Sequence, residues 1–214
     1  MKNSIILGLA LSVCIGLNNT AEAGLIGNDV IDRERNDTWT NFTTIDKSLK
    51  FTESGVITDW SIWSGGAGDI FLQVFRHVSD DTYTIVGENY FNNVTEGFNT
   101  WSVEATQQIE VSANDFIGFS LTSSLAHIDY DVRGNDVSHS DGSGSFVTGI
   151  GSLATLADEY YGFGYEFTFQ DRTYSISAET APAPVPEPAT MLLFGTGLAG
   201  MAGARFRKKQ KERC

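Results

Sequence analysis

Cysteine is almost missing from this sequence: the chain has 214 residues and two cysteines, Cys14 and Cys214. Cys14 lies in an N-terminal apolar stretch and Cys214 is the last residue, so the long span between them has none. This excludes a disulfide framework, a thiol nucleophile and a cysteine-based metal site from that span. A chain of this length can still bury a core that is large enough to fold without disulfides.

Basic residues are also scarce in the central part of the chain. Residues 24–186 contain 7 basic and 24 acidic residues, a net charge of −17, whereas the whole chain carries −13. A surface of this sign repels nucleic acid and anionic membranes, so we expect no nucleic-acid partner.

Known catalytic motifs are missing as well. The sequence contains no G-x-S-x-G elbow, no H-E-x-x-H and no P-loop. Its histidines, His77, His127 and His139, are isolated from one another, which favours structural or solvated roles. We therefore expect a protein that is not an enzyme. A glycosidase needs only two carboxylates, so a secreted glycan-active hydrolase with an unrecognised carboxylate pair is the alternative.

A long helical period is missing from the middle of the chain, where short alternating segments take its place. In "GVITDWSIWS" the alternation predicts one face with Val56, Thr58, Trp60 and Ile62. About ten such segments, separated by turn residues, predict an all-β domain over residues 24–180. We expect a β-sandwich of the jelly-roll type.

The two ends of the chain differ from this domain in composition. Lys2, an apolar run and an Ala-x-Ala site that ends at Ala23 predict a signal peptide over residues 1–23, which signal peptidase removes. All four prolines lie in residues 181–188, which predicts a stiff linker. The apolar stretch 189–204 predicts a short transmembrane helix in the inner membrane. A basic tail at 205–214 should stay cytoplasmic; its basic residues are Arg205, Arg207, Lys208, Lys209, Lys211 and Arg213.

This C-terminal order of features resembles the PEP-CTERM sorting signal. In that family a Val-Pro-Glu-Pro motif precedes a short hydrophobic helix and a basic end. Here Val185, Pro186, Glu187 and Pro188 match the motif, and residues 189–204 and 205–213 match the rest. The resemblance implies a Gram-negative bacterium that makes extracellular polysaccharide. It also implies processing by an exosortase and delivery of the protein to the cell surface or the exopolysaccharide matrix.

The domain itself is similar to surface β-sandwich modules that carry no defined activity. The likeness rests on a strand with Val56 and Trp60, a strand with Leu72 and Arg76, and the turn at residues 111–118.

The acidic loop between residues 129 and 141 is the best candidate for a metal site. Asp129 and Asp131 begin it like an EF-hand loop, but Arg133 and Ser140 occupy positions that should chelate calcium. A calcium site of another type remains open, with the candidate ligands Asp129, Asp131, Asp136 and Asp141. A solvated turn is the alternative reading of this loop.

Tryptophans are the candidates for contact with sugars. Trp60 shares its face with Ile62, so we expect it in the core, whereas Trp63 points the other way and precedes a Gly-rich turn. If that face is solvated, Trp63 is the most plausible platform for a sugar ring. Taken together, the sequence predicts a non-catalytic surface or matrix protein, with exopolysaccharide as a possible ligand.

Overall fold

The computed structural model describes residues 24–36, 41–122, 126–132, 134–140, 146–157, 159–162, 165–168 and 172–183. Within these residues the fold is all-β, as the sequence predicts, and it contains sixteen antiparallel strands. No helix in this part of the chain is long and apolar enough to cross a membrane. The predicted signal peptide, the motif at Val185–Pro188, the helix at 189–204 and the basic tail all lie outside the described residues.

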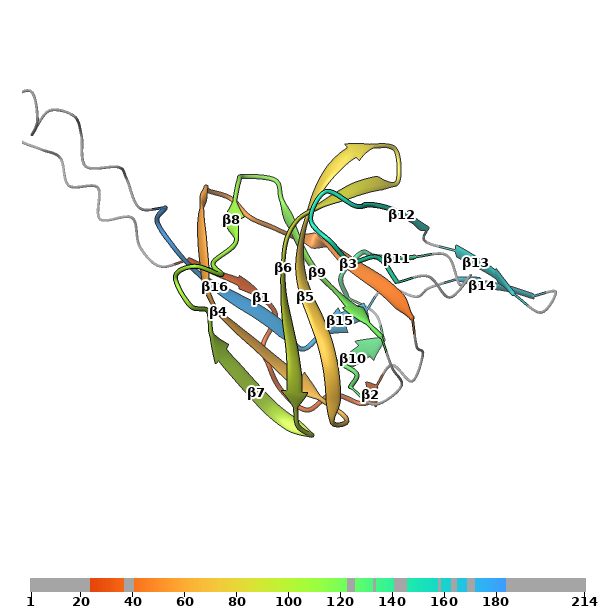
Figure 1. Ribbon diagram of the computed structural model, residues 1–214. Coiled ribbons are helices and arrows are strands. Elements are labelled where there is room, and N and C mark those ends of the chain that lie inside the picture. The colour runs from red at the N-terminus through yellow and green to blue at the C-terminus, as the bar shows by residue number, and fades with distance from the viewer. Residues whose placement is uncertain are drawn as a thin grey trace, which may run out of the picture.

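The strands form two main layers (Figure 1). The first is a five-stranded sheet with the order β1-β16-β4-β7, in which β8 also pairs with β4. Its strands are β1 (Gly24–Gly27), β16 (Ile176–Ala181), β4 (Gly55–Ser64), β7 (Gly97–Ser102) and β8 (Glu110–Val111).

The second layer closes on itself as a six-stranded barrel, β11-β12-β6-β5-β9-β3. Its strands are β11 (Val137–Ser140), β12 (Leu153–Ala157), β6 (Thr82–Val94), β5 (Gly68–Ser79), β9 (Phe116–Leu121) and β3 (Phe42–Lys50). The backbones of β3 and β9 approach closely at Gly118, where a Cβ would lie 2.2 Å from the carbonyl oxygen of Thr44. The sequence predicts a sandwich but not this closure, and the jelly-roll connectivity stays a prediction.

Two smaller sheets complete the described fold. A three-stranded sheet has the order β15-β10-β2, and β13 pairs with β14. Their strands are β15 (Arg172–Tyr174), β10 (Asp129–Val132), β2 (Arg35–Asn36), β13 (Glu159–Gly162) and β14 (Tyr165–Thr168).

Alternation along β5 divides the buried residues between two cores. Ile70, Leu72 and Val74 face the five-stranded sheet and pack in a core with Trp60 and other residues of that sheet. Phe75 points the other way and joins a second core that also contains residues of β3, β6, β9 and β12. This division follows from strand geometry, in which successive side chains point to opposite faces.

A β-bulge in β4 changes the face that the sequence predicts for this strand. Asp59 pairs with Glu179 and Ile57 with Thr180, which leaves Thr58 as the extra residue. Such a residue reverses the alternation on one side of the bulge. As a result Ile57, not Val56 or Thr58, joins Trp60 and Ile62 in the main core. The prediction is correct for Trp60 and Ile62 and wrong for Thr58, which is only half-buried; Val56 is buried but lies outside this core.

Candidate functional site

The outer face of the five-stranded sheet carries polar and aromatic side chains in cross-strand rows. On β4 the inward residues Trp60 and Ile62 are fully buried, so Asp59, Ser61 and Trp63 point outward. On β7 the pairing register places Ser102, Thr100 and Phe98 beside them in that order. Ser61 donates a hydrogen bond to Thr100 (3.1 Å) and Ser102 donates one to Asp59 (2.6 Å). This face is therefore lined with hydroxyl groups between an aromatic end and an acidic end.

Trp63 and Phe98 form the aromatic end of this face. They are directly paired across β4 and β7; Trp63 is half-buried, and Phe98 keeps 54% of its surface exposed. The structure thus places Trp63 on the outward face, opposite to the buried Trp60. The sequence analysis did not identify Phe98. The alternation of Phe98, Thr100 and Ser102 in "GFNTWS" assigns these three residues to one face, and only the strand pairing shows that Phe98 neighbours Trp63.

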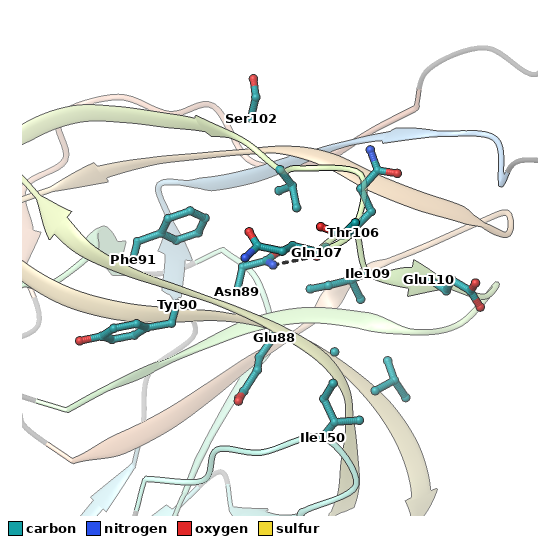
Figure 2. Close-up of a pocket in the computed structure, with 14 residues that line it drawn as sticks. Glu88, Asn89, Tyr90, Phe91, Ser102, Thr106, Gln107, Ile109, Glu110 and Ile150 are labelled. Atoms are coloured by element: carbon teal, nitrogen blue, oxygen red, sulfur yellow. Dashed lines mark hydrogen bonds between the residues drawn. The ribbon is translucent and has the colours of Figure 1, made fainter.

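A groove with a volume of about 690 Å³ lies between β6 and the segment 102–110. Figure 2 shows Asn89, Phe91 and Gln107 on one side of β6, and Glu88, Tyr90 and Ile150 on the other. Asn89 is fixed in this wall: it accepts a hydrogen bond from the indole of Trp60 (2.9 Å) and donates one to the carbonyl of Gln107 (3.0 Å). Asn89 therefore links the groove wall to the core.

Two aromatic residues line the groove, Tyr90 and Phe91, and each packs against a neighbouring aromatic ring. Phe91 stacks on Trp101 with ring centroids 4.3 Å apart and an interplanar angle of 16°. Tyr90 lies against Phe71 and donates a hydrogen bond to Asp69 (3.0 Å), which raises the pKa of its phenol. Trp101 is thus a packing residue, and Trp39 lies outside the described residues.

The predicted metal ligands have separate partners in the structure. Asp131 is ion-paired to Arg33 (2.7 Å), and Asp136 to Lys47 (2.9 Å). Hydrogen bonds from the backbone of Glu34 and from Arg33 lower the pKa of Asp131. Asp129 is buried, and burial together with the nearby charge of Asp32 raises its pKa to about 6.

Within the described residues no group of three His, Cys, Asp or Glu side chains is placed to hold a metal ion. Asp141 lies outside the described residues, so the calcium site stays a prediction. Two histidine side chains are described, and they have separate surroundings: the ring of His77 contacts the carbonyl of Asp80 at 2.7 Å, and His127 lies near Asp129.

The structure brings together all three segments on which the likeness to surface modules rests. Val111, at the start of the turn, pairs with Gly55 of β4, the strand that carries Val56 and Trp60. Arg76 at the end of β5 binds both carboxylate oxygens of Asp115, at 2.7 and 2.8 Å. Asp115 lies in the turn at residues 111–118 and also accepts a hydrogen bond from the backbone of Ser112 (2.8 Å). This arrangement clamps the turn to the barrel, which is a structural role.

The family described as the PEP-CTERM protein-sorting motif matches residues 184–208 of the chain. The chain carries a PEP-CTERM sorting motif. Residues Val185–Pro188, the apolar stretch and the first part of the basic tail all fall within the match. No curated protein and no solved structure matches the chain significantly. The PEP-CTERM motif implies an exported protein that an exosortase processes at the membrane before it reaches the surface.

Proposed function

We propose that this PEP-CTERM protein is a non-catalytic component of the cell surface or the exopolysaccharide matrix, and that its β domain binds polysaccharide. The observation that carries the proposal is the outward-facing pair Trp63 and Phe98 beside a row of hydroxyl groups. Aromatic rings offer an apolar platform to the face of a sugar, and hydroxyl groups offer hydrogen bonds to its edges. The sorting motif supports the proposal because it implies that the protein is exported.

Weak binding by each domain is sufficient for this function. Many copies held at one surface act together, because the first contact raises the effective concentration for the next. We therefore expect weak binding by a single domain and much stronger binding when the protein is displayed on beads.

The test is a glycan array probed with the exported protein and with Trp63→Ala, Phe98→Ala and Trp63→Tyr variants. We expect Trp63→Ala to weaken binding by roughly tenfold, or about 1.4 kcal/mol, and Trp63→Tyr to retain most of it. Phe146→Ala is the matched control, since Phe146 is also exposed but is not part of this sheet. Circular dichroism checks that each variant is folded.

Two outcomes would contradict the proposal. Failure of every glycan to bind, even to bead-displayed protein, would leave a surface protein with a different partner. Sustained release of reducing sugar by the purified protein would favour the hydrolase alternative.

A further inference from the structure

The five-stranded sheet that carries Trp63 and Phe98 has no lysine or arginine in any of its strands. The charged residues in those strands are Asp59, Glu179 and Glu110, all acidic. Three of the basic residues of the domain are instead ion-paired to aspartates elsewhere in the fold: Arg33, Lys47 and Arg76. The sheet therefore presents a purely negative field, within a domain that is itself strongly acidic.

Two of these carboxylates lie side by side on the outer face. Asp59 and Glu179 are directly paired across β4 and β16, in the same outward orientation as Ser61 and Trp63. Directly opposed like charges destabilise a sheet, and the sheet offers no basic side chain of its own to offset them. Asp59 and Trp63 lie on the same strand, β4, four residues apart. The acidic pair is therefore roughly 13 Å along the strand from the aromatic end of the face.

We infer that the polysaccharide bound at this face carries free amino groups. This inference rests on the proposed function and names the class of its ligand. One sugar ring lies on Trp63 and Phe98, and the chain crosses the hydroxyl groups of Ser61 and Thr100. An ammonium group further along the chain then binds between Asp59 and Glu179. An acidic polysaccharide is repelled from the same face, because no arginine or lysine of this sheet can bind its carboxylates.

The experiment compares oligosaccharides that differ only in the amine. Chitosan oligomers and their fully N-acetylated counterparts of equal length are titrated against the exported protein by calorimetry, with oligogalacturonates as the acidic probe. Mildly acidic conditions keep the amines protonated and the carboxylates ionised. We expect the chitosan oligomer to bind about fivefold more tightly than its N-acetylated counterpart, the size of an exposed ion pair. The difference should shrink as salt is added.

Substitutions test whether Asp59 and Glu179 are the source of the preference for the amine. The double variant Asp59→Asn, Glu179→Gln should lose the preference for the amine and keep its affinity for the N-acetylated oligomer. Asparagine still offers Ser102 an oxygen acceptor, and removal of two adjacent like charges should not impair folding. Asp80→Asn is the control: it removes an acidic charge that is not on this sheet, in the β5–β6 turn at a backbone φ of 45° that asparagine tolerates.

The outcomes separate this inference from the function on which it rests. Equal affinity for the two oligomers, with Trp63→Ala still weakening both, would overturn the amine preference alone. A preference that survives in the double variant would overturn its placement at Asp59 and Glu179. Absence of binding to every oligomer and every glycan on the array would overturn the proposed function as well.

Discussion

At the scale of single residues, Trp60 connects the main core to the wall of the groove. Its side chain is fully buried, and its indole nitrogen donates a hydrogen bond to Asn89. Trp60→Ala should lower the free energy of unfolding by roughly 3–5 kcal/mol, because it leaves a cavity and an unpaired amide oxygen. Chemical denaturation measures this loss. A Trp63→Ala variant that loses as much stability as Trp60→Ala would contradict the outward position of Trp63.

Asp46 makes stability depend on pH at the same scale. It is buried, and burial raises its pKa from 3.8 to about 6, although Asn135 and the backbone of Ser48 donate hydrogen bonds to it. Between these two pH values the folded protein binds a proton that the unfolded chain has lost, so stability falls as pH rises through this window. Across this window the protonation of Asp46 changes the free energy of unfolding by up to roughly 3 kcal/mol. The raised pKa of Asp129 also makes stability fall as the pH rises.

Urea denaturation at several pH values checks this prediction. The wild-type protein should lose stability as the pH rises from about 4 to about 6, and Asp46→Asn should flatten that decline, since an amide does not titrate. An unchanged pH dependence in the variant would show that the buried carboxyl of Asp46 is not its source.

At the scale of elements, the ion pair between Arg76 and Asp115 fastens the turn before β9 to the end of β5. Asp115 is 1% exposed, so Arg76→Ala leaves a buried carboxylate without its partner. We expect a loss of roughly 2–4 kcal/mol, with the lower values favoured because Arg76 is itself half-exposed. Lys47→Ala is the contrasting variant: its partner Asp136 is 62% exposed, so its loss should stay below about 1 kcal/mol. Thermal melts of the two variants give the comparison, and similar losses would argue against a clamp.

At the scale of the whole molecule, the two ends of the domain lie next to each other. Gly24, which directly follows the predicted signal cleavage site, pairs with Thr180, and β16 ends at Ala181 before the prolines begin. Cleavage after Ala23 and near Pro186–Pro188 would therefore remove none of the described strands. We expect the mature protein to start at Gly24 and end in this proline-rich stretch, as an intact-mass measurement would show. A mature chain that still contains Cys214 would contradict exosortase cleavage and favour a permanent membrane anchor.

The sequence by itself determined the features that depend on composition and on neighbours along the chain. These are the cysteine-free domain, the all-β class, the burial of Trp60 and the sorting motif at the C-terminal end. Alternation assigns residues to faces because strand geometry is local. The tertiary structure alone decided which strands are paired: Phe98 beside Trp63, Asp59 beside Glu179, Asp115 under Arg76, and six strands closed as a barrel. It also decided the bulge at Thr58, which reverses part of β4. Pairing and register arise from contacts between segments far apart in the chain, so no local pattern contains them.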